Sequence, residues 1–117
     1  MPLTIDNMFR HRNTDASGKA FPPATVQAVW DRAESSKEHR PLKMDPFGAL
    51  MWREAYGNNN SKLGWEIDHI IPVEEGGSDE LENLQALQWE NNRRKAQLIS
   101  EGLGSPENRK SGGLATA

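Results

Sequence analysis

The sequence contains no cysteine, and its 117 residues include no apolar run long enough to cross a membrane. Without cysteine there can be no disulfide and no zinc site built from thiolates, and nothing indicates an oxidising compartment. The first twenty residues also lack the continuous apolar stretch of a secretory signal. Hydrophobic residues make up only 35% of the chain, and its mean hydropathy is −0.81. We therefore expect a small core, a very polar surface and a cytoplasmic location.

The chain is short enough that we expect a single folded domain. Apolar residues recur on one face of a predicted helix: Val26, Val29, Trp30 and Ala33. We expect this helix and a proline-containing connector to occupy residues 21–46, after an irregular arm over residues 1–20. A compact core is expected over residues 47–100. Residues 101–117 are polar and rich in glycine and serine, which predicts a flexible tail.

The net charge of −3 does not suggest a nucleic-acid-binding protein, but the charges are unevenly distributed. Residues 66–90 include no lysine or arginine and eight acids: Glu66, Asp68, Glu74, Glu75, Asp79, Glu80, Glu82 and Glu90. Two arginines and a lysine follow at residues 93–95. A divalent cation held by acids would change the sign of the local field. The negative net charge is therefore weak evidence against a phosphate-containing substrate.

A strand, a long loop, a second strand and a helix are predicted between residues 65 and 99. The run "WEIDHIIPV" is typical of a strand, in which successive side chains point to opposite faces. The stretch "EEGGSDELE" has the composition of a loop, because Gly76 and Gly77 allow backbone angles that other residues resist. The stretch "NLQAL" predicts a second short strand or a turn of the chain. The stretch "QWENNRRKAQLIS" is rich in helix-forming residues and ends near Gly102.

Asp68 and His69 stand side by side in this otherwise apolar strand, where burying polar groups is costly. A carboxylate is a hard ligand suited to Mg²⁺ or Mn²⁺, and an imidazole that titrates near neutrality can take a proton from water. On a regular strand the two side chains would flank one site from opposite faces. An irregular strand end at Pro72 would instead let both lean toward a shared centre.

The predicted helix offers an amide and a cation on one face, because Asn92 and Lys95 are about one turn apart. Asn83 adds a second amide just before the second strand. If the helix packs across the strand pair, these groups converge with Asp68 and His69. A carboxylate, an imidazole, an amide oxygen and a cation together suit cleavage of a phosphodiester bond.

The segment "WEIDHIIPVEEGG…ENLQALQWENNRRK" resembles the ββα-metal core of HNH endonucleases, in the variant whose third signature residue is asparagine. The resemblance rests on residues at the family's spacing: Asp68, His69, Pro72, Gly76, Gly77, Asn83, Leu84, Gln85, Leu87, Asn92 and Lys95. It covers about residues 47–96, because "YG…GWEIDH" also fits small bacterial and phage members. It implies an α+β fold, with a small ββα-metal core, an added N-terminal helix and flexible termini.

The resemblance implies a metal-dependent endonuclease that hydrolyses DNA phosphodiester bonds. One divalent metal would be held by Asp68 and the side-chain oxygen of Asn92, and would stabilise charge on the scissile phosphate and the departing 3′ oxygen. His69 would be the general base that deprotonates the attacking water. Asn83 would brace the loop and help to orient His69.

DNA is the partner that the resemblance implies, and its phosphates would be contacted by Lys95 together with Arg93 or Arg94. The products would carry 5′-phosphate and 3′-hydroxyl ends. No membrane partner is expected, and the oligomeric state stays open.

The oxygen ligands favour Mg²⁺ or Mn²⁺ as the working ion, although Zn²⁺ could occupy the same site. Many family members also carry Cys-x-x-Cys pairs that bind a structural zinc. This chain has Gln88 and Asn91 where the second pair would fall, so we expect no structural zinc. The core must then be held by packing, and Trp52, Trp65 and Trp89 are the candidates.

Three assignments stay open at this level. Asn91 could replace Asn92 as the ligand if the helix is turned differently. Glu66 fits a metal ligand, a support for the ligands or a solvated strand residue. Arg93 and Arg94 are as compatible with an ordinary helix surface as with phosphate binding.

The main alternative function is a catalytically silent ββα module that binds nucleic acid or a protein partner. The intact set of Asp68, His69 and Asn92 argues against such a loss of activity. A nuclease toxin with an immunity partner is less favoured, because such domains are usually basic and this chain is acidic.

Overall fold

A computed structural model describes residues 11–106 of the chain. Its longer elements are α2 (Pro23–Arg32), β4 (Trp65–His69), β5 (Leu84–Gln88) and α3 (Trp89–Ser100). Short strands β1 (Glu34–Ser35), β2 (Lys43–Met44) and β3 (Leu50–Met51), with 3₁₀ turns η1 (Arg53–Ala55), η2 (Val73–Glu75) and η3 (Leu81–Asn83), complete the described part. Helices and antiparallel strands in one small domain confirm the predicted α+β class. Among these residues no helix is long and apolar enough to span a membrane.

The strands form two separate sheets. β4 and β5 pair antiparallel over five residues each, from Trp65 opposite Gln88 to His69 opposite Leu84. β1, β2 and β3 form the second, smaller antiparallel sheet. The chain passes from β5 directly into α3, so that strand, loop, strand and helix follow in the predicted order.

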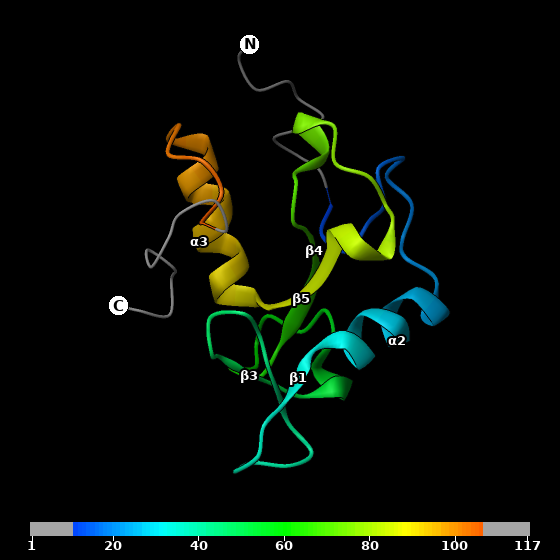
Figure 1. Cartoon of the computed structure of the whole chain (residues 1–117), viewed down its shortest axis with the longest axis vertical. Helices are drawn as coiled ribbons and strands as arrows, with labels where there is room; N and C mark the ends of the chain where they lie inside the picture. Colours follow the sequence, from blue (N-terminus) through cyan, green and yellow to red (C-terminus); the bar gives the residue numbers. More distant parts are fainter. Residues whose placement is uncertain (1–10, 107–117) are drawn as a thin grey trace.

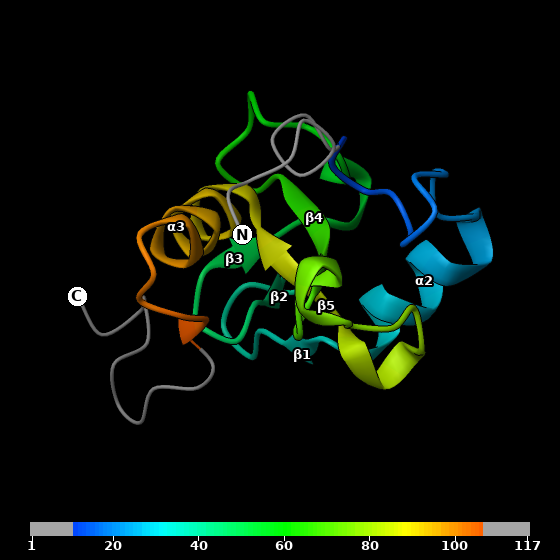
Figure 2. The same cartoon turned by 90° about the horizontal axis from the view of Figure 1, so that it is seen from above.

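The β4–β5 pair lies between two helices. Figure 1 shows α2 on one side of the pair and α3 on the other, and the view from above in Figure 2 shows the same arrangement. All five residues of β4 are consequently buried, polar ones included. This burial on both faces places Asp68 and His69 in the interior of the domain rather than on an open sheet.

The core lies between α2 and the β4–β5 pair. It is formed by Phe21, Val26, Val29, Trp30, Met51, Trp65, Ile67, Leu84 and Ala86. The Trp65 ring is fully buried, with ring centroids 5.2 Å from Trp30 and 4.9 Å from Tyr56. Its Nε1–H donates to the backbone carbonyl of Trp52 at 3.0 Å, which satisfies the one polar atom of the ring.

The packing of the other tryptophans differs from the prediction in one case. Trp89 is half-buried, and its Nε1–H donates to the Ser61 carbonyl at 2.8 Å. Trp52 was expected to pack in the core, but 45% of the residue is exposed. That expectation is wrong: Trp52 supports the core through its backbone carbonyl, which accepts a hydrogen bond from Trp65.

The described part of the N-terminal arm lies against β4. The side-chain oxygen of Asn13 accepts a hydrogen bond from the Ile67 amide at 2.8 Å. Thr14 and Ala20 form an isolated antiparallel bridge, which folds residues 14–20 back on themselves. The arm therefore covers an edge of β4, at the strand that carries the candidate site. Residues 1–10 of the predicted arm and 107–117 of the predicted tail lie outside the described residues.

Candidate functional site

Two acids on β4 face two polar residues of α3. Glu66 and Asp68 are separated by one residue on the strand and are 3% and 9% exposed. Asn92 and Lys95 are buried on the helix that crosses this face. The Lys95 ammonium donates to Asp68 Oδ2 at 2.7 Å, and the Asn92 amide donates to Glu66 Oε1 at 2.7 Å. The predicted packing of the helix across the strand thus brings both predicted metal ligands to one interface, each with its own partner.

Lys95 acts as the internal counter-ion of Asp68. It is 2% exposed, and its ammonium also donates to the carbonyls of His69 and Ile70, at 3.1 Å each. Gln85, opposite Asp68 on β5, donates a further hydrogen bond to Asp68 Oδ2 at 2.9 Å. A direct contact between Lys95 and DNA phosphate would therefore require the ammonium to leave Asp68.

Glu66 organises the start of α3. Its Oε1 accepts from the Asn92 side chain and from Arg93 Nη1, the latter at 2.8 Å. Arg93 also lies over the Trp89 ring, 5.7 Å from its centroid, with 32% of its side chain exposed. The hydrogen bond from Asn92 Nδ2 to Glu66 fixes the orientation of the Asn92 amide. Its Oδ1 is then the atom suited to bind a metal.

Asn91 faces a different part of the molecule. Its Nδ2 donates to Asp45 Oδ2 at 2.9 Å, and the same carboxylate oxygen accepts from the Gln88 amide at 3.0 Å. Asn91 therefore fastens the start of α3 to the loop after β2. This arrangement favours Asn92 over Asn91 as the candidate ligand.

His69 points to the opposite face of β4 from Asp68. Its Nε2 lies 2.8 Å from Oδ1 of Asp79, in the loop between the strands. Its ring is 5.8 Å from the Phe21 ring, centroid to centroid. β4 stays regular through His69, so the two side chains flank the strand end instead of leaning toward one centre.

Asn83 closes the base of the loop after His69. Its Oδ1 accepts from the Ile71 amide at 2.8 Å, and its Nδ2 donates to the carbonyls of Ile71 and Ser78. Its backbone carbonyl accepts from the Ile70 amide at 2.8 Å. These contacts tie Asn83 to Ile70 and Ile71, the two residues after His69, and to Ser78 within the loop, so any influence of Asn83 on the imidazole is transmitted by the backbone.

The loop leaves no room for a side chain at Gly77. A Cβ there would lie 1.7 Å from the Ile71 carbonyl oxygen and 2.9 Å from Asn83 Nδ2. We expect Gly77→Ala to lower the free energy of unfolding by about 3 kcal/mol, at the upper end of overpacking effects. Gly76→Ala is the matched control, because a Cβ there meets no atom but the residue has φ of +91°; it should cost about 1–2 kcal/mol. Urea unfolding measures both, and equal stability of Gly77→Ala and wild type would contradict this packing.

The acids of the site influence the pKa values of two residues that the sequence did not single out, Arg12 and Tyr56. Partial desolvation lowers the pKa of Arg12, and Arg93 lowers it further, whereas Glu66 and Asp68 raise it. Arg12 is therefore a cation of the arm that lies close to both acids. Burial, helped by the charge of Glu66, raises the pKa of Tyr56 to about 12. This phenol is protonated at neutral pH.

The donor atoms suit a hard divalent cation. Within residues 11–106 there is no group of three or more His, Cys, Asp or Glu side chains placed to hold a metal. Mg²⁺ is commonly bound through one or two carboxylates, with water and substrate phosphate completing its shell. The Asp68 carboxylate and the Asn92 amide oxygen fit this kind of site.

An antiparallel strand pair followed by a helix that covers its acidic face defines a ββα unit. Residues 57–97, which contain this unit, match the family model described as HNH endonuclease. Residues 57–97 are therefore similar to the HNH endonuclease family, as the sequence motifs indicated. Such domains act on nucleic acids and usually use a divalent metal. No curated protein and no solved structure matches the chain.

Proposed function

We propose that the protein is a metal-dependent endonuclease that hydrolyses DNA phosphodiester bonds. The observation that carries this proposal is the set of buried polar side chains around Asp68, inside a domain of a nuclease family. Burying an acid, an amide and an ammonium together is costly unless they pair or serve a function. The silent binding module is less favoured, because Asp68, His69 and Asn92 of the family motif are all present.

Asp68 and Asn92 Oδ1 would hold the metal, which is Mg²⁺ or Mn²⁺ by its oxygen donors. The bound ion supplies charge stabilisation at the scissile phosphate and the departing 3′ oxygen. Glu66 serves this site by fixing the Asn92 amide through its Nδ2 group. Lys95 lies 2.7 Å from Asp68 Oδ2 and compensates the charge of this carboxylate when no metal is bound.

His69 is the proposed general base. It takes a proton from a water molecule, and the resulting hydroxide attacks phosphorus. The bond from phosphorus to the 3′ oxygen breaks, and this oxygen takes up a proton from solvent. The products are a 5′-phosphate and a 3′-hydroxyl end. Asn83 serves the step by holding the loop that begins directly after His69.

The DNA phosphates would lie over the start of α3. Arg94 is exposed and Arg93 is partly exposed, so both side chains can reach a phosphate from solvent. Arg12 adds a third cation close to Glu66 and Asp68. Lys95 would reach a phosphate only by leaving Asp68.

Metal-dependent cleavage of supercoiled plasmid tests the proposal. Purified protein should convert supercoiled plasmid to nicked or linear product in Mg²⁺ or Mn²⁺. Cleavage should stop in excess chelator and resume when the metal is restored. End labelling of the products should show 5′-phosphates. Binding of DNA without cleavage in any of these metals would favour the silent module instead.

A further inference from the structure

We propose that Asp79 is a positioning residue for His69 and that the N-terminal arm holds Asp79 in place. This inference rests on the proposed function of His69 and adds to it a residue that the family motif does not assign. It rests on a side-chain contact on the face of β4 opposite α3. The Asp79 carboxylate lies 2.8 Å from His69 Nε2, and 40% of its side chain is exposed.

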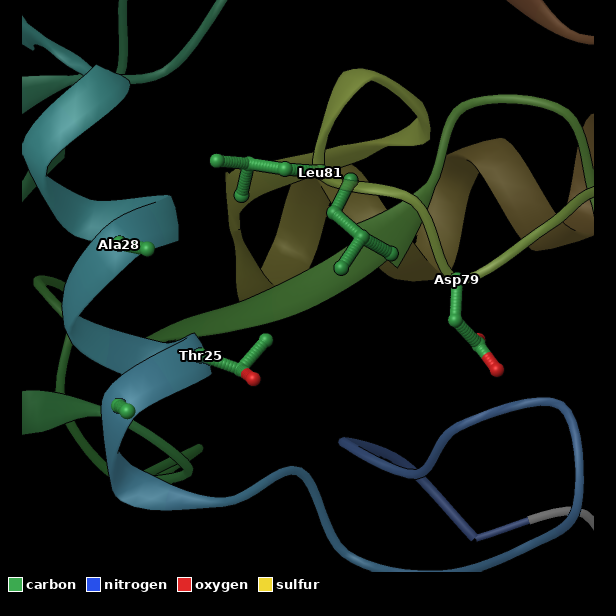
Figure 3. A pocket seen from close by; sticks show the side chains of 6 residues that line it. Thr25, Ala28, Asp79 and Leu81 are labelled. Carbon is green, nitrogen blue, oxygen red and sulfur yellow. The ribbon is translucent and has the colours of Figure 1, made fainter.

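The arm supplies the second half of the arrangement. The backbone amide of Ala16 donates to both carboxylate oxygens of Asp79, at 3.0 and 3.1 Å. Figure 3 shows the Asp79 carboxylate directed from its loop toward the arm, away from the labelled residues of α2. An exposed carboxylate held at both oxygens has little freedom to rotate away from the imidazole.

Two further contacts hold the imidazole and the arm in this arrangement. Phe21, the residue directly after the arm, packs against the His69 ring. Asn13 bonds the arm to the Ile67 amide of the same strand. Residues 13–21 therefore contact β4, the imidazole and its carboxylate partner at once. This segment lies outside residues 57–97, so the family's own domain is completed here by a part of the chain that precedes it.

The contact fixes the chemical form of the imidazole. An ionised carboxylate only accepts hydrogen bonds, so His69 Nε2 carries the proton that lies toward Asp79. Nδ1 then holds the lone pair, which makes it the atom that takes the proton from water.

Asp79→Asn tests this role with almost no change in shape. Its amide can offer an N–H to Nε2, which favours the opposite tautomer and removes the lone pair from Nδ1. We expect kcat for plasmid cleavage to fall about 10–100-fold with KM unchanged, as for other residues that orient a reacting group. Glu80→Gln, which removes the neighbouring charge, is the matched control and should leave kcat unchanged.

Two further variants separate orientation from general damage. In a His69→Ala background, Asp79→Asn should have no additional effect, because it acts only through the imidazole. Ala16→Pro removes the amide that holds Asp79, at the second position of the turn closed by Gly18 N–H and the Asp15 carbonyl, where proline is tolerated. It should lower kcat in the same direction as Asp79→Asn but by less.

Nitrogen-15 NMR of the His69 ring tests the proposal without a cleavage assay. Wild-type His69 should carry its proton on Nε2 when neutral, and Asp79→Asn should shift the population toward Nδ1, while Glu80→Gln should not. A wild-type tautomer protonated at Nδ1, or full kcat in Asp79→Asn, would overturn the role of Asp79. If the wild type does not cleave at all, the nuclease assignment fails, and the tautomer alone then supports or overturns the positioning.

Discussion

His69→Ala is expected to lower the rate constant of plasmid cleavage by about 10²–10⁴-fold, the usual contribution of a general base. The substitution removes the only group in the proposal that takes a proton from water, and leaves Asp68 and Asn92 at the other face of β4. Mg²⁺ binding, measured by calorimetry, should therefore be retained. The comparison is made in single-turnover reactions, so that product release does not hide the chemical step.

His39→Ala is the matched control for this loss. His39 is exposed in the connector before β2, and its removal should leave the rate constant unchanged. The His69→Ala variant must also keep the wild-type circular dichroism, since Phe21 loses a packing partner. Cleavage at the wild-type rate by folded His69→Ala would refute the assignment of the base.

Lys95→Met is expected to lower the free energy of unfolding by about 3–5 kcal/mol, because it leaves the Asp68 charge buried without its counter-ion. The methionine fills nearly the same space, so the loss reports charge rather than volume. Lys62→Met, at an exposed lysine, should change stability by less than about 0.5 kcal/mol. Urea unfolding in chelator measures both variants.

Divalent metal should partly reverse the defect of Lys95→Met. An ion bound at Asp68 supplies the missing positive charge, and it stabilises the folded state by mass action. The midpoint of thermal unfolding should therefore rise more with Mg²⁺ in Lys95→Met than in wild type. Wild-type stability of Lys95→Met in chelator, or an equal rise with Mg²⁺ in both proteins, would contradict the pairing and the placement of the ion.

The order of elements around the site could be predicted because each depends on local patterns. The helical spacing of Val26, Val29 and Trp30 predicts α2, and all three residues are buried. Alternation in "WEIDH" predicts β4, the stretch "NLQAL" overlaps β5 by four residues, and the helix-forming run after it predicts α3. Motif spacing also indicated the family whose model matches residues 57–97, because the ββα unit is contiguous in sequence.

The partners of the site residues could not be predicted, because they depend on how distant segments meet. Asn92 and Lys95 share a helix face, but which acid each one meets depends on the rotation of α3 over β4. The sequence suggests that Asp68 could share a centre with His69, whereas a regular strand places their side chains on opposite faces. The sequence indicated only that Asp79 is one of several acids in a loop. The backbone amide that holds it belongs to Ala16, 63 residues earlier.

The N-terminal arm is the clearest example of contacts that could not be predicted from the sequence. Its polar composition indicated an irregular segment, and no local pattern marks a residue that docks on a strand. Asn13 pairs with the Ile67 amide, and Arg12 lies close to the acids, because the fold brings β4 to them. Such contacts follow from the assembled domain and leave little trace in the order of residue types.

The central claim is tested most directly by one plasmid assay, with wild type, His69→Ala and Asn92→Ala compared in Mg²⁺ and in chelator. We predict nicked or linear product from the wild type in Mg²⁺ alone. We predict loss of activity in both variants, with weaker Mg²⁺ binding only in Asn92→Ala. Intact plasmid with folded wild-type protein in Mg²⁺ and Mn²⁺, or equal cleavage by all three proteins, would contradict the account.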